Sequence, residues 1–281
     1  MTRNARFQQW EALLGNRNKR LRSGEFLVQG VRPITMAAEF GWEIRELLCN
    51  ADVRLSAWAE GILDSASANA GAGGAAEIDV AGELMAELGG KDESAPELLA
   101  VVGMPADDLD RIPVGPVGPD GEGALVVVFD RPAGPGNIGT LIRSADAFGA
   151  SGVIVTGHAA DIYDPKCVRA STGSLFSVPA VRVPSQRQVL DWTDALRRDG
   201  VPIQVAGTDE KGDRDAADYD FTQPTLLLIG NETSGLSSAW REACDYLIRI
   251  PMAAGAASSL NAATAASVVL YESIRQRTAS S

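Results

Sequence analysis

The sequence predicts an α/β protein whose C-terminal part folds as a mostly parallel sheet covered by helices. From residue 124 onward, short continuously apolar segments alternate with helical segments, which is typical of parallel strands buried on both faces. Two of the apolar segments, residues 226–229 and 247–250, run into loops rich in Gly, Ser and Asn. Loops at the carboxyl ends of such strands are where open α/β sheets bind ligands, so we expect the functional site there.

The remaining elements of this part follow the same alternation. The pattern predicts further strands at 124–129, 153–156 and 203–206, and helices at 140–148, 187–198 and about 260–277. The N-terminal part is predicted to be a smaller α/β unit, with strands at 26–28 and 47–49, a helix at 34–39 and a Gly/Ala/Ser-rich surface loop at 65–76. A Pro- and Gly-rich stretch at 113–123 predicts a linker, which divides the chain into domains 1–112 and 124–281.

Composition limits the class of function. The 281 residues carry a net charge of −12, which argues against a general attraction to nucleic acid. However, residues 1–32 hold seven Arg and Lys against only Glu11 and Glu25. This basic arm is either a patch that contacts RNA or a solvated helix face.

Other residue counts point to a cytoplasmic protein without metal. Cys49, Cys167 and Cys244 have no paired spacing, and His158 is the one histidine, so neither a disulfide framework nor a zinc site is expected. The N-terminus lacks the apolar core of a signal peptide, and no apolar run reaches the length of a membrane span. We therefore expect a cytoplasmic location and no membrane partner.

One motif suggests a dinucleotide-binding enzyme. Residues 134–139 read Gly-Pro-Gly-Asn-Ile-Gly after a predicted strand, which matches the G-x-G-x-x-G pattern. The next strand ends at Thr156 without the acidic residue that should bind a ribose, and Pro132 and Pro135 stiffen the turn. A nicotinamide-dependent enzyme is therefore the weaker alternative.

A second pattern overlaps these residues, namely Asn137-x-Gly139-x-x-x-Arg143. Asn137 precedes the predicted helix and Arg143 lies near its first turn, so both are expected to face one loop region. Taken alone, such a pair is more often a helix cap together with a solvated arginine than a functional site.

Two more segments follow the Asn137–Arg143 pattern in order, namely Ile229-Gly230-Asn231-Glu232, and Ile250-Pro251-Met252 followed by Ser259-Leu260-Asn261. Together the three segments resemble the motifs of the SpoU (TrmH-like) RNA 2′-O-ribose methyltransferases. The resemblance covers about residues 122–277. Residues 24–32 resemble the ribosomal-protein-like RNA-binding domain of many family members, with Gln29 where these often have Glu. The interval from Met252 to Ser259 is one small residue longer than expected.

The resemblance implies a SPOUT-class fold with a trefoil knot, S-adenosylmethionine as cofactor, no metal, and a homodimer. The residues that it implies for cofactor binding are Thr208, Gly230, Ile250, Met252 and Leu260. Gly230 is expected because a backbone without Cβ lets a ligand approach closely. The residues implied for catalysis are Arg143, Asn137, Glu232, Ser259 and Asn261, with Glu232 expected to hold the geometry of the site through Arg143.

Three further segments, residues 3–20, 106–113 and 221–225, resemble those family members that methylate a uridine of 23S rRNA and confer resistance to a ribosome-targeting antibiotic. The residues predicted to bind RNA are Arg17, Lys19, Arg20, Arg22, Arg32, Lys166 and Arg169. Every cofactor motif follows residue 123, so residues 1–110 are expected to be dispensable for cofactor binding. A tRNA or housekeeping rRNA methyltransferase, and a non-catalytic RNA-binding protein, remain alternatives.

Overall fold

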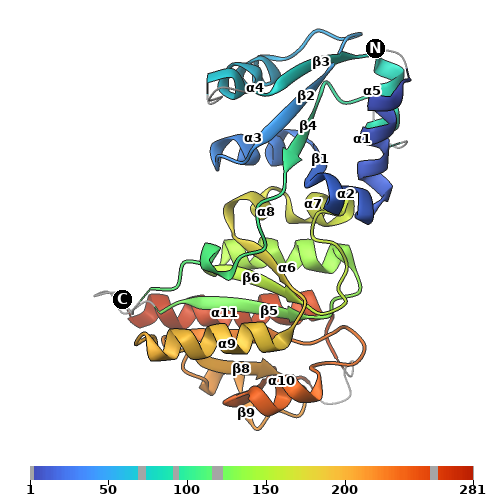
Figure 1. Cartoon of the computed structure of the whole chain (residues 1–281). Helices are drawn as coiled ribbons and strands as arrows, with labels where there is room; N and C mark the ends of the chain where they lie inside the picture. The colour runs from blue at the N-terminus through green and yellow to red at the C-terminus, as the bar shows by residue number, and fades with distance from the viewer. Residues whose placement is uncertain (1–2, 69–73, 91–94, 116–122, 254–258, 281) are drawn as a thin grey trace. The chain divides into compact units, whose positions relative to one another are not determined.

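The computed structural model describes residues 3–68, 74–90, 95–115, 123–253 and 259–280. The chain forms two compact units (Figure 1). Unit 1 comprises Met1–Pro105 with Tyr163–Ser177, and unit 2 comprises Ala106–Ile162 with Val178–Ser281. The sequence analysis had assigned Tyr163–Ser177 to the C-terminal domain, and the predicted linker falls largely on residues 116–122, which lie outside the described part.

Unit 2 contains the predicted parallel sheet. The described strands have the order β7 (Ala180–Val183), β6 (Gly152–Thr156), β5 (Leu125–Asp130), β10 (Thr225–Ile229), β8 (Gln204–Thr208), β11 (Tyr246–Arg249) and β9 (Arg214–Asp215). All neighbouring pairs are parallel. The carboxyl ends of these strands therefore meet at one edge, where the sequence places its polar loops. The trefoil knot stays a prediction.

Helices cover both faces of this sheet. On one face, α9 (Gln186–Arg198) and α10 (Ser238–Ala243) contribute Val189 and Trp240 to a core with Val126 and Val128 of β5. The intervening residue Val127 is also fully buried, as expected when side chains alternate across a covered sheet. Helices α6 (Pro135–Ala147) and α11 (Ala262–Ser280) pack against each other (Figure 1). Short 3₁₀ turns occur at Leu109–Arg111 and Ala216–Asp218.

The predicted start of α6 was wrong. The helix begins at Pro135 rather than at residue 140, because proline is well suited to the first helical position. Asn137 therefore lies inside the first turn, and Arg143 lies about two turns further along. At 100° per residue, the six-residue separation turns the two side chains about 120° apart, so they do not share one face.

Unit 1 is a four-stranded mixed sheet with the order β1 (Glu25–Gln29), β4 (Leu98–Gly103), β2 (Ile44–Asn50) and β3 (Ala76–Val80). Its helices are α1 (Ala5–Gly15), α2 (Arg17–Ser23), α3 (Val31–Glu39), α4 (Ala57–Ala68) and α5 (Gly82–Gly89). Phe7, Trp10 and Leu13 of α1 pack with Leu84 and Leu88 of α5 in one core. The predicted loop at 65–76 is partly wrong, because α4 continues to Ala68 and β3 starts at Ala76; residues 69–73 lie outside the described part.

The segment Tyr163–Ser177 forms α7 (Pro165–Ser171) and α8 (Ser174–Ser177) and belongs to the core of unit 1. The ring of Tyr163 lies 4.7 Å from that of Phe26, and the ring of Phe176 lies 5.0 Å from that of Trp42. The indole Nε1 of Trp42 donates to the carbonyl of Phe176 (3.0 Å). Because Tyr163 and Phe176 are buried, this segment depends on residues 1–105 for its packing.

In the part of the chain that the structure describes, no helix combines the length and the apolar character needed to cross a bilayer.

Candidate active site

A cavity of about 860 Å³ opens at the carboxyl ends of β8, β10 and β11 in unit 2. All five residues predicted to bind a cofactor line it, namely Thr208, Gly230, Ile250, Met252 and Leu260. Its size lies within the roughly 300–1,000 Å³ of small-molecule sites. The second and third sequence motifs therefore meet in one cavity, as expected for loops at the same edge of a parallel sheet.

The cavity combines an apolar wall with charged groups. Met252 and Leu260 are 40% and 39% exposed although they are apolar, so the cavity offers them as binding surface. Among the charged lining residues, Arg241 forms an ion pair with Asp209, and Arg249 pairs with Asp215 at 2.6 Å. Such a mixture suits a ligand with both a flat apolar part and charged groups.

Gly230 has a steric reason of its own besides the predicted one. A Cβ at this position would lie 2.4 Å from the backbone carbon of Gly235 and 2.5 Å from the backbone nitrogen of Leu236. The glycine is therefore needed so that the chain can fold back on itself, and its approach to a ligand stays a prediction. Consequently, a larger residue at 230 would disturb the loop before it blocked a cofactor.

Glu232 lies at one end of a hydrogen-bonded chain of side chains. Its Oε1 accepts from Nδ2 of Asn137 (3.0 Å), and Oδ1 of Asn137 accepts from Nδ2 of Asn261 (3.2 Å). Oδ1 of Asn261 in turn accepts from the backbone N–H groups of Ala263 and Thr264 and caps α11. The chain therefore joins α6, the loop after β10 and α11.

The carboxylate of Glu232 also accepts from the backbone N–H groups of Ala133 (3.0 Å) and Gly134 (3.2 Å). Burial acts to raise the pKa of this carboxyl, but the hydrogen bonds from Asn137, Ala133 and Gly134 outweigh it and hold the pKa below its usual range. Glu232 is thus held ionised, as an acceptor rather than a proton donor.

This arrangement also excludes a pyrophosphate at the G-x-G-x-x-G-like motif. In a dinucleotide site the amides at the helix N-terminus bind the phosphates. Here Ala133 and Gly134, which lead into α6, give their amides to Glu232, and Gly136 is already inside the helix. The dinucleotide interpretation was therefore a false match.

Arg143 is exposed on α6. Within the described residues its guanidinium forms no hydrogen bond or ion pair, so the structure does not join it to Glu232 as the sequence analysis had expected. Ser259 is exposed and lines the cavity, but Asn261 rather than Ser259 caps α11.

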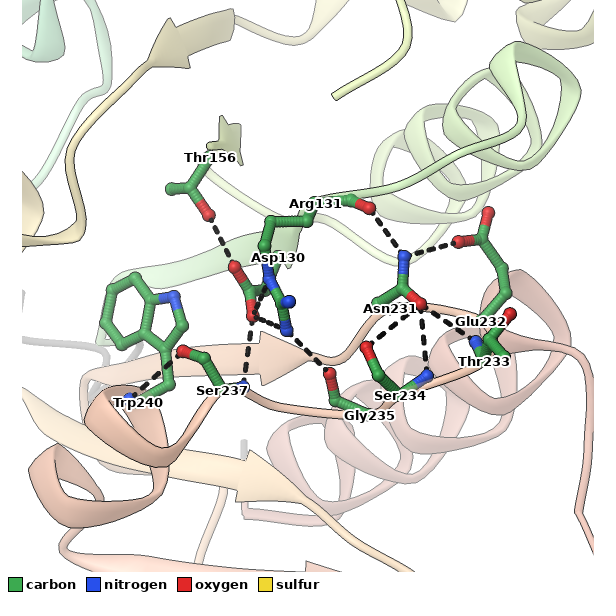
Figure 2. Close-up of polar contacts among 10 residues, drawn as sticks. All are labelled: Asp130, Arg131, Thr156, Asn231, Glu232, Thr233, Ser234, Gly235, Ser237 and Trp240. Carbon is green, nitrogen blue, oxygen red and sulfur yellow. Dashed lines mark hydrogen bonds and ion pairs between the residues drawn. The ribbon is translucent and has the colours of Figure 1, made fainter. Parts of the chain in front are cut away.

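Asn231 is a residue that sequence reasoning missed, although it stands inside the motif next to Glu232. Its Nδ2 donates to the carbonyl of Arg131 (2.7 Å) and approaches Oε2 of Glu232 (3.4 Å). Figure 2 shows this amide between the two groups. The sequence feature that could have identified Asn231 is its place directly before Glu232 in a turn after a strand, because asparagine is favoured in turns for the hydrogen bonds that it makes to nearby backbone.

The side chains predicted to bind RNA all fall in unit 1, where α2, the start of α3 and α7 carry them. Most are exposed; they are Arg17, Arg22, Arg32, Lys166 and Arg169, with Lys19 half-buried. Arg20 is an exception, because only 2% of it is exposed and its Nη1 donates to the carbonyls of Leu13 (2.6 Å) and Leu14 (3.2 Å). It fastens the end of α1 and is not placed to contact a phosphate.

Two contacts join the basic elements that are distant in sequence. Nε of Arg32 donates to the carbonyl of Thr172 (3.0 Å). The side-chain amide of Gln29 has hydrogen-bond partners for both its oxygen and its nitrogen. The oxygen accepts from Nη1 of Arg169 (3.1 Å), and the nitrogen donates to the carbonyl of Gly89 (3.2 Å). A glutamate at position 29 has no N–H to donate to Gly89.

No group of three or more His, Cys, Asp and Glu residues suited to a metal ion occurs among the described residues. Burial raises the pKa of the Cys49 and Cys244 thiols to about 11. Both thiols are therefore protonated at neutral pH and are poor ligands and nucleophiles.

Comparison with known proteins agrees with this geometry. The model of the SpoU rRNA methylase family matches residues 124–271, and that of the SpoU L30e-like domain matches residues 4–100. The 23S rRNA (uridine(2479)-2′-O)-methyltransferase of Streptomyces viridochromogenes is 62% identical over 276 residues, which cover 98% of this chain and 91% of that protein.

Solved structures give the same result. The SpoU methyltransferase AviRb of S. viridochromogenes, in complex with the cofactor AdoMet, is 61% identical with a TM-score of 0.90 over 98% of this chain and 99% of that one. An AdoMet-bound rRNA methyltransferase from Sinorhizobium meliloti is 28% identical with a TM-score of 0.82, covering 98% and 96% of the two chains. The chain therefore belongs to the SpoU rRNA methylase family.

Proposed function

We propose that this protein transfers a methyl group from S-adenosylmethionine to the ribose 2′-hydroxyl of a uridine in 23S rRNA, in the cytoplasm. The relative that is 62% identical over nearly the whole chain carries that activity in its name. The observation that carries the proposal is the hydrogen-bonded chain Asn261–Asn137–Glu232 beside a cavity lined by every predicted cofactor residue.

The cavity residues fit S-adenosylmethionine. Ile250, Met252 and Leu260 offer an apolar surface for an adenine ring, and Thr208 adds a hydroxyl oxygen. Glu232 is ionised and lines the same cavity, which favours a cation there. When bound, S-adenosylmethionine supplies a methyl group on a positively charged sulfur. No metal is included in this proposal.

The catalytic residues act by position and charge. Arg143 is exposed and is available to bind the phosphate next to the target ribose and to stabilise negative charge on the 2′-oxygen. An arginine guanidinium stays protonated in proteins and is a poor general base, so a phosphate oxygen or water takes the proton. Asn137 and Asn261 fix the site, and Ser259 adds a hydroxyl at its edge.

Glu232 is an orienting group in this proposal rather than the proton acceptor. Its two oxygens accept from Ala133, Gly134, Asn137 and Asn231, which leaves little capacity for a substrate hydroxyl. Its charge instead fixes the amide of Asn137.

RNA is proposed to bind the basic face of unit 1, defined here as Arg17, Lys19, Arg22, Arg32, Lys166 and Arg169. The contacts Arg32–Thr172 and Arg169–Gln29 connect its two sequence regions. Because the whole chain has a net charge of −12, contacts with RNA phosphates are expected to concentrate on these positively charged side chains. Unit 1 thus serves substrate recognition and unit 2 serves methyl transfer.

A homodimer is proposed to form on the faces of α6 and α11. Val268 and Tyr271 of α11 are apolar yet 41% and 57% exposed. The two helices are joined by the Ser144–Ser267 hydrogen bond (2.7 Å), and the ring of Phe148, at the end of α6, contacts the ring of Tyr271. Sedimentation equilibrium of the wild type and of Tyr271→Glu tests this, since a monomeric wild type contradicts it.

The experiment for the whole proposal is methyl transfer from labelled S-adenosylmethionine to 23S rRNA, with mapping of 2′-O-methylation. A single methylated uridine is the expected result. A tRNA product favours the alternative within the family, and cofactor binding without transfer to any RNA favours a non-catalytic RNA-binding protein. Expression in a susceptible bacterium then tests whether the modification confers resistance to a ribosome-targeting antibiotic.

A further inference from the structure

The turn that carries Glu232 is a closed unit. The backbone groups of Asn231 and Gly235 exchange two hydrogen bonds, each 3.0 Å long. Oδ1 of Asn231 accepts from the backbone N–H groups of Thr233 (2.9 Å) and Ser234 (3.1 Å). Every residue from Asn231 to Gly235 lines the cavity. The place where this turn is attached therefore decides where Glu232 and one wall of the cavity lie.

Asp130 and Arg131, at the end of β5, hold the turn from outside the cavity (Figure 2). The carbonyl of Arg131 accepts from Nδ2 of Asn231 (2.7 Å), and Nη2 of Arg131 donates to the carbonyl of Gly235 (3.3 Å). Oδ2 of Asp130 accepts from the backbone N–H of Ser237 (3.2 Å). The turn is thus fastened at its first residue, at its last residue and just beyond it.

The guanidinium of Arg131 serves two partners. Asp130 is only 3% exposed, and a buried carboxylate needs a compensating charge and hydrogen bonds. Nε and Nη2 of Arg131 lie 3.1 and 3.0 Å from Oδ2 of Asp130, and Thr156 donates to Oδ1 (3.3 Å). The same Nη2 also donates to the carbonyl of Gly235. One guanidinium therefore both compensates the buried charge of Asp130 and attaches the turn.

The backbone at Arg131 supports a dedicated role. Its φ is 51°, in the left-handed region that non-glycine residues rarely adopt. Such a conformation persists only where the surroundings hold it, and it is found preferentially at functional sites. Gly157 leaves the space for the arginine, since a Cβ at Gly157 would lie 2.7 Å from Cγ of Arg131.

We propose that Arg131 is a positioning residue for this reaction: paired with Asp130, it sets the position of the Asn231–Gly235 turn, and thereby that of Glu232 and the cofactor cavity. Asn231 transmits the position, because its amide lies between the carbonyl of Arg131 and Oε2 of Glu232. The catalytic part of this inference rests on the proposed function, whereas the attachment of the turn does not.

The test compares Arg131→Gln with the double variant Asp130→Asn/Arg131→Gln in the full-length protein. The first removes the guanidinium contacts and leaves the backbone carbonyl in place. The second also removes the buried negative charge, so that an unpaired Asp130 does not unfold the protein. Arg187→Gln is the matched control, because Arg187 pairs with Asp191 on the exposed surface of α9 in the same unit.

The first measurement is hydrogen exchange in the protein without cofactor. We expect the amides of residues 231–237 to exchange about tenfold faster in both variants and not in the control. Calorimetry with S-adenosylmethionine should show about tenfold weaker binding, and kcat should fall about tenfold to a hundredfold with an unchanged KM for RNA.

Wild-type exchange of the turn together with wild-type cofactor affinity overturns the proposal. A lower melting temperature with an unchanged turn and unchanged affinity also overturns it, because Arg131 is then merely structural. If the wild-type protein binds no S-adenosylmethionine but the turn loosens in both variants, the proposed function fails while the positioning of the turn stands.

Discussion

Nδ2 of Asn137 donates a hydrogen bond of 3.0 Å to the carboxylate of Glu232, 95 residues later in the chain. The same carboxylate accepts from the amides of Ala133 and Gly134 just before α6. The negative side chain of Glu232 thus lies near the N-terminus of α6, where the helix dipole favours an anion. The glycine-rich turn before α6, which resembles a phosphate-binding turn in sequence, therefore binds Glu232 instead, and Glu232 orients the amide of Asn137.

Arg143→Ala is expected to abolish most methyl transfer while leaving fold and cofactor affinity unchanged. Arg143 is exposed and outside the cavity lining, so we expect its loss to remove the proposed contact to RNA and to leave the cofactor cavity intact. One lost charge-assisted contact in the transition state costs about 3 kcal/mol, roughly a hundredfold in rate. Single-turnover assays and calorimetry check this, and near-normal turnover would refute the assignment. Arg143→Lys should keep part of the rate, because it keeps the charge without the planar fork.

Glu232→Gln is expected to loosen the site. A glutamine presents one N–H₂ group to donors that now face a carboxylate oxygen, so at least one of Ala133, Gly134 and Asn137 loses its acceptor. Hydrogen bonds to a charged acceptor are worth about 2 kcal/mol each. We expect lower stability and a lower kcat, measured by denaturant unfolding and by methyl transfer; unchanged values for both contradict the orienting role.

The same residue predicts a pH dependence. Its pKa in the folded protein is below the ordinary value of 4.5, so the ionised form stabilises the fold. This contribution to the free energy of unfolding is fully present above pH 4.5 and is lost as the pH falls through the pKa of Glu232 in the folded protein. The difference in unfolding free energy between wild type and Glu232→Gln should therefore be constant from neutral pH to about 5 and shrink below 4.5. A difference in unfolding free energy that grows as the pH falls would show that the pKa of Glu232 is raised in the folded protein.

Charge reversal on the basic face is expected to weaken RNA binding from both sequence regions. Lys166→Glu/Arg169→Glu should reduce rRNA affinity as Arg17→Glu/Arg22→Glu does, since both pairs belong to unit 1. Each lost phosphate contact lowers the slope of log affinity against log salt by roughly one. Arg187→Glu serves as the control. If only Arg17→Glu/Arg22→Glu weakens binding and Lys166→Glu/Arg169→Glu does not, α7 is not part of the RNA-binding surface.

Arg20→Ala is expected to destabilise unit 1 without a specific effect on RNA. The guanidinium is buried, donates to the carbonyls of Leu13 and Leu14, and lies 3.7 Å from the carboxylate of Asp164, which caps α7. Removing one partner of a buried charged network costs on the order of 3 kcal/mol. Arg22→Ala is the matched control, because Arg22 is exposed. Equal unfolding free energies for the two variants would contradict this role.

Removal of residues 1–105 is expected to destabilise the remaining chain rather than leave a sound catalytic domain. Tyr163 and Phe176 would lose Phe26 and Trp42, which exposes large aromatic surfaces. We expect aggregation or loss of a cooperative thermal transition. A monodisperse truncated protein that binds S-adenosylmethionine normally would restore the independence that the sequence suggested.

The sequence by itself determined the family and placed five strands of the parallel sheet to within about two residues, but it missed β7 and β9, the strands at the two ends of that sheet. Apolar runs such as residues 226–229 and the ordered motifs from Asn137 to Asn261 are local patterns, and local patterns report burial periodicity and strand ends. Only the tertiary structure decided that Tyr163–Ser177 packs in unit 1, that Arg20 is buried, that Gly230 is required by Gly235, and that Glu232 meets the amides before α6. Each of these depends on side chains and backbone brought together from distant parts of the chain or by a loop that folds back, and no spacing along the sequence encodes which of them will meet.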